Sequence, residues 1–482
     1  MAMTKIAEPY SFTPAYNPIK FIYNSTNKNN TGFKYIYDIY ESGTANKIAE
    51  YRVLPEFGTG NGIIDLTKLL QAKVTYDLNV NSISAAVYTA NNSIYKYDVK
   101  VGEEYLTFKA YTSALTASGT NVQINVANTF AVGDQVVITQ ADLGVANPQL
   151  EGLFTVLSAT GANFVVNSLW AAVTNVNIDG SVTYADNRKT ITRAIATDLN
   201  NYVFNGALRW VDFPSYTPNT YDLNYNKDLF LTNQPLDFTA TLSQDIFVQT
   251  HNANGATDFM YFENSDGDIF RKNVTSASEL SHVGVGPANT DTLTVVSGTL
   301  PLIKPTTEYY EYWYDRGAGQ VSAKYAVNID RRLKGEEYSI LFLDRMGSWS
   351  SFAFTLANYE TGNVTRELFS KDVQGFISGT MWNYDTSDRG LSNVYTSVEK
   401  SIELNGNYMT EQMAAYFEEL VSSPVTLIRY ANYSESCDEA TLFDYVSCNV
   451  TTSNFSIFKQ KNKNLIRQSI NITFANKDLV NG

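Results

Sequence analysis

The chain has 482 residues, of which 17% are charged and 13% are aromatic, with 33 tyrosines and 26 phenylalanines. Tyrosine, phenylalanine and valine favour strands, and asparagine and glycine favour the turns between them, so the composition indicates a β-rich globular protein and excludes a disordered chain. The net charge of −14 opposes binding to duplex DNA or anionic lipid, and no apolar run approaches the roughly 18 residues of a membrane span.

The segment RVLPEFGTGNGIIDLTKLLQ, from Arg52 to Gln71, has the glycine content of a phosphate-binding loop. The dinucleotide fingerprint needs G-x-G-x-x-G, and the P-loop needs a Lys-Ser/Thr pair. This segment has neither, because Gly62 is followed by Ile63 and Ile64. We therefore expect no cofactor here, but a glycine-rich turn that leads an extended segment into a short helix.

A composition shift marks an inserted domain. No lysine or arginine occurs between Lys109 and Arg188, where small β-forming residues, glycine and asparagine dominate. Turn signals separate about five or six short strands there, which is the pattern of a small β-barrel. The flanking segments look like strands of one host domain. We expect an N-terminal β-domain at 1–108 and 188–245, interrupted by the inserted domain at 109–187.

The remainder predicts a second β-domain at 246–400 and a C-terminal part at 401–482. The stretch SILFLDRMGSWSSFAF has a strand-turn-strand pattern that is typical of a hairpin. The predicted fold class is therefore mainly β: multi-domain β-sandwiches with a small inserted β-barrel-like domain and few helices.

One segment of the C-terminal part, TEQMAAYFEELVSS, has the period of an amphipathic helix. Thr410 is its predicted N-cap, and Pro424 prevents it from continuing. Met413, Phe417 and Leu420 share one face of this helix. Because a short helix needs tertiary burial to persist, we expect that face to pack against the sheet.

The segment TTEYYEYWYDRG is the densest aromatic cluster. In a strand it places Tyr310, Tyr312 and Tyr314 on one face and Trp313 on the other. Tyrosine and tryptophan are typical of cores and of subunit interfaces, and a stacking platform for sugars is an alternative. A nucleic-acid platform would need interleaved Lys or Arg, whereas the neighbours here are mainly acidic. Tyr310, Tyr312, Trp313 and Tyr314 are our candidate interface residues.

Catalysis has little support in the sequence. The two histidines, His251 and His282, lie in turn-like polar stretches, where we expect surface or interface side chains. Two isolated histidines are poor material for a Ser-His-Asp triad or a zinc site. We expect no catalytic residue and no metal site, and therefore not an enzyme.

Acidic residues also have simpler explanations than chemistry. Adjacent carboxylates point to different faces of a strand or helix, so we expect them on solvated surface; the pairs are Glu103-Glu104, Glu336-Glu337 and Glu418-Glu419. In the stretch SDGD, Asp266 and Asp268 could offer oxygen ligands to calcium. The ligand spacing of a calcium loop is absent, so a hairpin turn explains this stretch better.

Five stretches together carry a resemblance to a known group of proteins: YNPIKFIYNS, RVLPEFGTGNGIIDLTKLLQ, VGEEY, FLDRMGSWSSFAF and NGNYMTEQMAAYFEELVSSPVTLIRY. In these stretches the chain resembles virion structural proteins of tailed bacteriophages of Bacteroidetes, including the crAss-like phages. The segment between Lys109 and Arg188 is also similar to a β-domain inserted into such proteins. The resemblance implies a component of the tail or neck of the virion, such as a ring protein of the portal–tail connection.

A ring or collar subunit around the DNA-ejection channel is the function that this resemblance implies. Its partners would be copies of itself, meeting through head-to-tail interfaces, together with other tail, neck or portal proteins and fibre proteins. DNA would pass only as cargo, past an acidic or neutral channel wall, and no membrane would be involved.

The implied location is the virion, after assembly in the host bacterial cytoplasm, where we expect Cys437 and Cys448 to stay as free thiols. The alternative function is a receptor-binding or fibre-adaptor tail protein that binds surface glycans. A fibre should show repeats or a trimeric coiled-coil seam, and the sequence has neither. No sequence motif supports a third possibility, a glycan-degrading enzyme.

Overall fold

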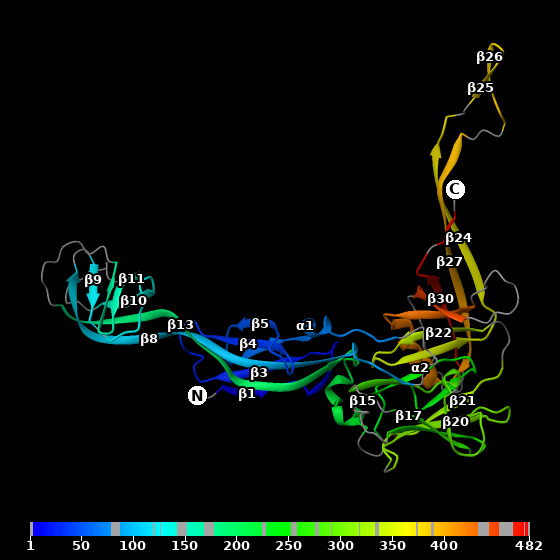
Figure 1. Cartoon of the computed structure of the whole chain (residues 1–482), viewed down its shortest axis with the longest axis horizontal. Helices are drawn as coiled ribbons and strands as arrows, with labels where there is room; N and C mark the ends of the chain where they lie inside the picture. Colours follow the sequence, from blue (N-terminus) through cyan, green and yellow to red (C-terminus); the bar gives the residue numbers. More distant parts are fainter. Residues whose placement is uncertain are drawn as a thin grey trace. The chain divides into compact units, whose positions relative to one another are not determined.

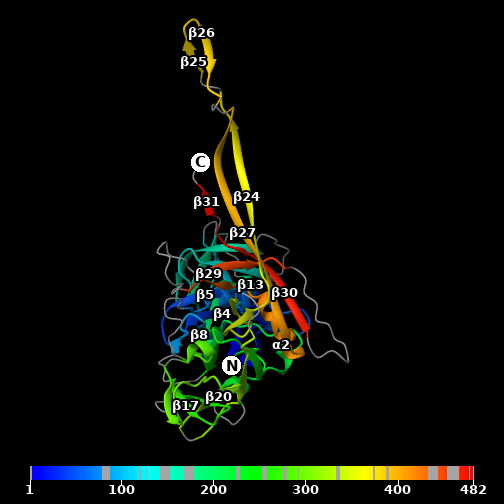
Figure 2. The ribbon, with the colours of Figure 1, turned by 90° about the vertical axis from the view of Figure 1, so that its right-hand side faces the viewer.

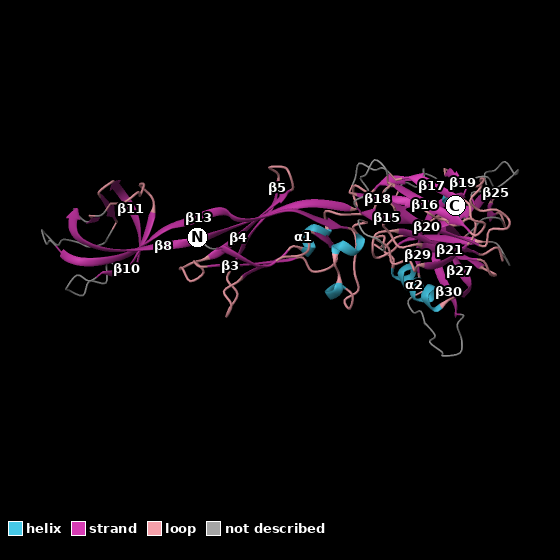
Figure 3. Cartoon of the chain, turned by 90° about the horizontal axis from the view of Figure 1, so that it is seen from below, coloured by secondary structure: helices cyan, strands magenta, loops and turns pink. Residues whose placement is uncertain are grey.

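In the computed structural model, the chain forms two compact units made largely of strands (Figure 1, Figure 3). Unit 1 contains Met1–Thr13, Pro18–Leu70 and Lys96–Val203, and unit 2 contains Pro14–Asn17, Gln71–Tyr95 and Phe204–Gly482. The structure describes residues 3–78, 87–118, 121–125, 127–141, 152–167, 178–223, 228–251, 258–274, 279–290, 292–317, 319–332, 337–372, 375–386, 390–431, 443–452, 466–476 and 478–480. The predicted fold class, mainly β with several sheets and few helices, is confirmed. No helix within these ranges is long and apolar enough to cross a membrane.

Unit 1 contains a three-stranded sheet and most of a nine-stranded sheet. The smaller sheet has the order β1 (Met3–Ala7), β3 (Lys20–Ser25) and β6 (Gly62–Asp65). The larger sheet has the order β2 (Phe12–Pro14), β13 (Ile178–Phe204), β10 (Gln135–Ala141), β11 (Gly152–Thr160), β12 (Asn163–Val166), β9 (Asn121–Ile124), β8 (Ile94–Ser118), β4 (Lys34–Glu41) and β5 (Lys47–Val53).

The glycine-rich segment after β5 is a structural turn of unit 1. The hydroxyl of Tyr35 donates to the backbone oxygen of Gly60 at 2.8 Å. The hydroxyl of Tyr37 donates to the backbone oxygen of Gly62 at 2.7 Å. A Cβ at position 62 would lie 2.4 Å from the Tyr35 ring, so the close approach requires glycine. β6 then leads into helix α1 (Thr67–Gln71), and the predicted turn and short helix are confirmed.

Two long strands connect the predicted insert to the rest of unit 1. β8 enters the insert and β13 leaves it, and β9 to β12 lie between them in the sequence. In sheet order, β13, β10, β11, β12, β9 and β8 form a closed cycle, because β13 also pairs with β8. Such closure is the strand order of a small barrel. The limits expected at residues 108 and 187 fall inside β8 and β13, so host and insert share continuous strands.

Unit 2 contains four further sheets within the described ranges. The six-stranded sheet has the order β14 (Asp237–Ala240), β21 (Tyr325–Ile329), β20 (Tyr309–Asp315), β16 (Phe259–Asn264), β17 (Ile269–Asn273) and β19 (Thr294–Ser297). The three-stranded sheet has the order β15 (Phe247–His251), β18 (Leu280–Gly284) and β7 (Val87–Thr89). Short 3-10 helices lie at Phe213–Ser215, Pro218–Tyr221 and Pro287–Asn289.

The largest sheet of unit 2 carries a long two-stranded extension (Figure 2). Its order is β23 (Trp349–Phe354), β22 (Tyr338–Leu343), β28 (Thr426–Ala431), β29 (Phe443–Val450), β30 (Ile466–Phe474), β27 (Leu391–Met409) and β24 (Tyr359–Ser370). β31 (Asp478–Val480) also pairs with β27. Between β24 and β27 in the sequence, β25 (Gly375–Ser378) and β26 (Met381–Tyr384) form a separate hairpin.

A hydrophobic core joins the six-stranded sheet, the largest sheet and helix α2 (Glu411–Ser422) of unit 2. Met413, Phe417 and Leu420 of α2 are buried in this core, as their shared face predicts. The Thr410 hydroxyl accepts the backbone N–H of Met413 at 3.3 Å, which confirms the predicted N-cap. The apolar face of the helix therefore completes the core between two sheets.

Two other expected domain limits are not found. β14 pairs in parallel with β21, so residues 204–245 belong to unit 2 and not to the N-terminal domain. The limit expected at residue 400 falls inside β27, whose second half pairs with β30. One continuous strand links 246–400 to 401–482, and side chains from both ranges fill the same core. The sequence could not show this, because the pairing partners lie far apart along the chain.

Candidate functional site

Three of the four predicted interface residues lie inside unit 2. The side chains of Tyr310, Tyr312 and Tyr314 on β20 are 0% exposed and belong to the core. The Tyr310 hydroxyl donates to the Val285 backbone oxygen at 2.6 Å. The Tyr314 hydroxyl lies 2.9 Å from Asp258 Oδ2, to which it donates. The predicted alternation is confirmed, but the interface interpretation is wrong for these three, because core packing already covers them.

Trp313 lies on the opposite, partly exposed face of β20. Its ring stacks on Tyr261 with the centroids 5.7 Å apart, and the Lys324 ammonium lies 4.3 Å from its centroid. Lys324 also pairs with Glu263 at 3.2 Å and with Glu311 at 3.0 Å. Trp313 is therefore held by neighbours of its own sheet. Its prediction as an interface residue stays a prediction.

The two histidines have surroundings that the sequence does not indicate. His282 is fully buried on β18, where its ring lies 4.9 Å from that of Tyr88 on β7. Burial lowers the pKa of His282 to about 3, so the ring is neutral at physiological pH. Burial also lowers the pKa of His251, whose Nδ1 lies 3.6 Å from Asp222. The expectation of a surface or interface side chain is wrong for His282, because β18 is the central strand of its sheet.

The adjacent carboxylates of β8 are buried, and the prediction of a solvated face is wrong for them. Glu103 accepts hydrogen bonds from Ser25 Oγ and Asn27 Nδ2, both at 2.7 Å. Glu104 lies 3.5 Å from Arg52 Nε. Both carboxylates are stabilised by partners that lie far away in the sequence. They therefore belong to the structure of unit 1.

The predicted SDGD turn connects β16 and β17 as a hairpin. Gly267 has a φ of 85°, which suits glycine, and Asp268 forms an ion pair with Lys304. Asp266 accepts a hydrogen bond from Thr307 Oγ1 at 3.0 Å. In the described part of the chain, no group of three or more His, Cys, Asp or Glu residues could hold a metal ion.

One of the two cysteines can be described. Cys448 is a buried free thiol on β29, with its Sγ 3.7 Å from Thr426 Oγ1. Burial raises the pKa of Cys448 to about 11, so the thiol stays protonated at neutral pH. Cys437 lies outside the described residues.

The most unusual surface of unit 2 is the extension formed by β24 and the first half of β27, which we call the arm. β24 pairs with β27 from Tyr359 opposite Glu403 to Ser370 opposite Leu391. All twelve residues of β24 are exposed. Figure 2 shows the arm leaving the rest of its sheet, with β25 and β26 at its far end. Outside β27, no described strand pairs with β24.

The hairpin of β25 and β26, which we call the tip hairpin, exposes large apolar side chains on both faces. Strand alternation and the register place Ile377, Trp382 and Tyr384 on one face and Phe376 and Met381 on the other. Ile377 is 77% exposed, Met381 74% and Trp382 60%. The Trp382 and Tyr384 rings lie 5.7 Å apart. The tip hairpin is therefore an apolar and aromatic surface that the described chain leaves uncovered.

A glycine shapes one face of the tip hairpin. A Cβ at Gly375 would lie 2.2 Å from the indole of Trp382, so the ring lies over the strand at that position. The indole extends the apolar face that Ile377 begins. A two-stranded hairpin is at best marginally stable alone, and apolar patches of this kind mark interaction sites. The arrangement suits contact with another macromolecule.

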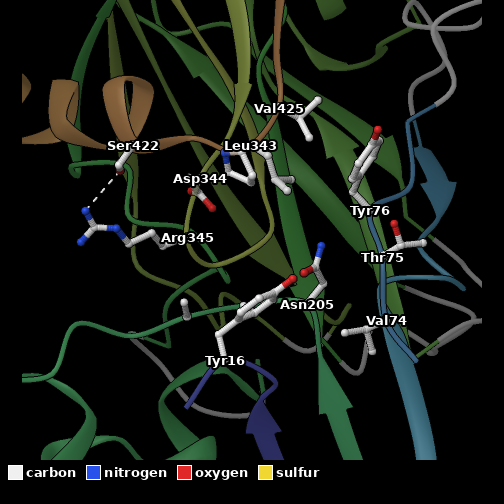
Figure 4. A pocket seen from close by; sticks show the side chains of 13 residues that line it. Tyr16, Val74, Thr75, Tyr76, Asn205, Leu343, Asp344, Arg345, Ser422 and Val425 are labelled. Atoms are coloured by element: carbon white, nitrogen blue, oxygen red, sulfur yellow. Dashed lines mark hydrogen bonds between the residues drawn. The ribbon is translucent and has the colours of Figure 1, made fainter. Parts of the chain in front are cut away.

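Unit 2 also contains a pocket of about 420 Å³, which Figure 4 shows from close by. Its wall is mainly apolar and aromatic, with a few polar side chains: Tyr16, Val74, Thr75, Tyr76, Asn205, Leu343, Asp344, Arg345, Ser422 and Val425. The wall is formed by the segment after β2, the segment before β7, the segment after β13, the end of β22 with its turn, and the end of α2 with the segment after it. The volume is in the range of pockets that take a small ligand or a few side chains.

Hydrogen bonds hold the polar part of the pocket wall in place. Asp344 Oδ1 accepts the backbone N–H groups of Met346 and Ser348, both at 2.9 Å. Burial, with a further contribution from the nearby Glu419 carboxylate, raises the pKa of Asp344 to about 7. The Arg345 backbone N–H donates to Glu419 Oε2 at 2.9 Å. Glu419 is buried, so the predicted solvated face is wrong for it as well.

Sequence reasoning missed the tip hairpin. Its stretch, GFISGTMWNY, has bulky residues at both odd and even positions around a Gly-Thr turn. A strand buried on both faces has the same pattern. A signal was present in the polar strand before it, because TGNVTRE does not provide an apolar face to pack on.

Comparisons with known proteins do not identify a family. No protein-family model and no curated protein matches the chain. Among solved structures, the endosialidase of phage phi92 is 12% identical, with 100% of this chain and 70% of that chain covered and a TM-score of 0.19. The full extracellular region of plexin A4 is 8% identical, with 99% and 43% covered and a TM-score of 0.12. TM-scores this low do not support a conclusion about function.

Proposed function

We propose that the chain is a structural subunit of a phage tail or neck that assembles into a ring or collar around the DNA-ejection channel. The observation that carries the proposal is the arm with its tip hairpin. In an isolated subunit, the apolar side chains of the tip hairpin are exposed to water; these are Phe376, Ile377, Met381, Trp382 and Tyr384. In an assembly, a neighbouring subunit can cover them.

The energetics favour assembly through the tip hairpin. Burial of a large apolar side chain contributes about 1.5–3 kcal/mol relative to exposure. Tryptophan and tyrosine in the centre of an interface frequently dominate its binding energy. Trp382 and Tyr384 are adjacent on one face, so their contributions can be used together. The arm is therefore equipped to supply most of the affinity of one contact.

The charge of the chain agrees with a channel that lets DNA pass. The net charge of −14 per subunit, repeated around a ring, disfavours attachment of a polyanion. Each phosphate paired with Lys or Arg would add salt-dependent affinity and slow the passage of DNA. The isolated subunit is expected to show no binding to duplex DNA at low salt, measured by fluorescence anisotropy. Tight and salt-sensitive binding would contradict a role as a conduit.

The alternative, a glycan-binding tail protein, loses its main support. A sugar platform on β20 would need the face of Tyr310, Tyr312 and Tyr314, which is buried. The other face offers Trp313, but the ammonium of Lys324 lies over that ring. The ring and collar proposal therefore has the stronger basis.

Sedimentation of the purified chain tests the proposal. The intact chain is expected to form assemblies larger than a monomer in concentrated solution. The double variant Ile377→Ser, Trp382→Ser is expected to stay monomeric with unchanged circular dichroism. The matched control is Leu54→Ser, Leu153→Ser, which changes two exposed apolar residues of unit 1 and should assemble normally. A tip variant that assembles like the intact chain would refute the proposal.

A further inference from the structure

We propose that the tip hairpin of one subunit inserts into the 420 Å³ pocket of unit 2 of a second copy of this chain. This inference rests on the proposed assembly and names the partner of the tip hairpin. Ile377, Trp382 and Tyr384 form the inserted face. The receiving wall contains Val74 and Tyr76 from the segment before β7.

The length of the arm excludes the pocket of the same subunit. β24 is twelve residues long, which corresponds to about 40 Å at 3.3 Å per residue. Tyr359, at its start, pairs with Glu403 beside the sheet, and Ser370, at its end, pairs with Leu391. The pairing is continuous apart from one bulge, so the arm cannot fold back onto its own sheet. The pocket wall includes Leu343 of that sheet, so the tip hairpin cannot fill its own pocket.

The two surfaces match in chemistry. The tip hairpin is apolar and aromatic, and the pocket has Tyr16, Leu343 and Val425 in its wall (Figure 4). Aromatic anchors in such pockets are typical of strong protein interfaces. A buried indole N–H needs an acceptor, and the side-chain amide of Asn205 lies in the wall. The volume is sufficient for a few side chains and too small for a folded domain.

Charged groups lie beside both surfaces. Lys371, Asp372 and Asp385 flank the tip hairpin. Asp344 and Arg345 lie in the pocket wall, and Lys73 directly precedes Val74 of that wall. The Arg345 guanidinium also contacts Glu418 at 2.7 Å, which fixes its position. Each surface thus offers charges of both signs that can orient the tip hairpin, while apolar contact supplies the affinity.

A tip and a pocket are different surfaces, so their contact is heterologous. Every subunit then has one tip to donate and one pocket to fill. Such head-to-tail contacts close into a ring when the rotation between neighbours allows it. The geometry of a ring thus follows from two surfaces of a single chain.

Mixing two complementary variants of the full chain tests this inference. Thr75→Trp blocks the pocket at an exposed position of its wall, and Ile377→Ser, Trp382→Ser disables the tip hairpin. Each variant alone is expected to be monomeric. An equimolar mixture is expected to form heterodimers and nothing larger, because only one intact tip and one intact pocket remain per pair. Sedimentation velocity measures the sizes.

The controls separate this inference from the proposed function. Thr4→Trp, an exposed threonine of unit 1, should assemble like the intact chain, and unfolding curves should show that every variant is folded. Thr75→Arg provides a second blocked pocket if Thr75→Trp fails to fold. A pocket variant that assembles normally, or a mixture that stays monomeric, overturns the inference and leaves the proposed function standing. A tip variant that assembles normally overturns the proposed function itself.

Discussion

β27 is one continuous strand with two different surroundings. Its second half pairs with β30, and Ile402 and Leu404 of that half are buried in the core. Its first half pairs with β24 and, over three residues, with β31. Leu391, Val394 and Tyr395 of that half are exposed. Both halves contain large apolar residues, so apolar content alone does not decide which half is buried.

The difference is what covers each half. The core half pairs with β30 and is covered by a second layer, which includes α2 and the six-stranded sheet. The arm half is a ribbon without a second layer in the described chain. A sheet face gains stability only when another layer removes it from water. The comparison teaches that the arm is a strand pair without a covering layer in the described chain, and the proposed function assigns that layer to another molecule.

The largest expected effect is on the core side. Phe417 is 0% exposed, and its ring lies 5.4 Å from that of Phe352. Phe417→Ala should lower the free energy of unfolding by about 3–5 kcal/mol, because it removes a ring and leaves a cavity. Chemical unfolding followed by circular dichroism measures the change. A loss below about 1 kcal/mol would place Phe417 outside the core and contradict the claim that α2 covers the core half of β27.

Acid should weaken the interior of unit 2 through His282. The pKa of His282 is about 3 in the folded chain, against about 6.5 in an unfolded chain, so the unfolded chain binds the proton more readily. The contribution of His282 to stability is therefore full above pH 6.5 and falls as the pH decreases, by up to about 1.4 kcal/mol per pH unit.

Between pH 5 and 6.5 the free energy of unfolding of His282→Phe should fall less steeply with decreasing pH than that of the intact chain, by up to about 1.4 kcal/mol per pH unit, because phenylalanine has no proton to gain. Unfolding curves at several pH values measure the slope for both chains, and pH 7.5 serves as the reference. His251→Gln is the control variant, and it should keep most of the pH dependence that His282 contributes. Equal slopes in the intact chain and in His282→Phe would show that this ring does not titrate on unfolding.

A smaller effect is expected at the start of α2. Thr410→Ala removes the hydroxyl that accepts the Met413 backbone N–H, so the free energy of unfolding should fall by about 1 kcal/mol. Thr410→Ser keeps the acceptor and should restore most of the loss. Thermal unfolding measures both variants. If alanine and serine behave alike, the cap does not contribute.

The smallest expected effect on the free energy of unfolding is at Trp382 in the tip hairpin. Trp382→Ala should change the free energy of unfolding of the monomeric subunit by less than about 0.5 kcal/mol, because the indole is 60% exposed there. The same substitution should weaken assembly at least tenfold, because a buried tryptophan is frequently a dominant contact. A large loss of monomer stability would instead assign Trp382 to the interior of its own chain.

Local patterns predicted much of this fold. The period of α2, the N-cap at Thr410 and the alternation along β20 were readable because each depends on neighbours in the sequence. The burial of His282 was not readable, because it depends on β15 and β7 pairing with β18 across long sequence separations. The partners of Glu103 are likewise distant. Local periodicity says which residues share a face and not what covers that face.

The candidate site was hidden for the same reason. Phe376, Met381 and Trp382 were as apolar as core residues in the sequence, and only the structure shows that they lack a covering layer. Tyr310 and Tyr312 stood out in the sequence, but other parts of the same chain cover them in the core. Three of the four aromatic residues singled out in the sequence therefore belong to the core, whereas the exposed surface of the tip hairpin was not singled out.

Hydrogen–deuterium exchange of residues 375–384, compared between the monomer and the assembled chain, tests the central claim most directly. The account predicts fast exchange of these amides in the monomer, since the tip hairpin is an uncovered two-stranded ribbon. It predicts strong protection after assembly, when a neighbouring subunit covers the tip hairpin. Equal and fast exchange in both states would contradict the claim that the arm is the contact between subunits.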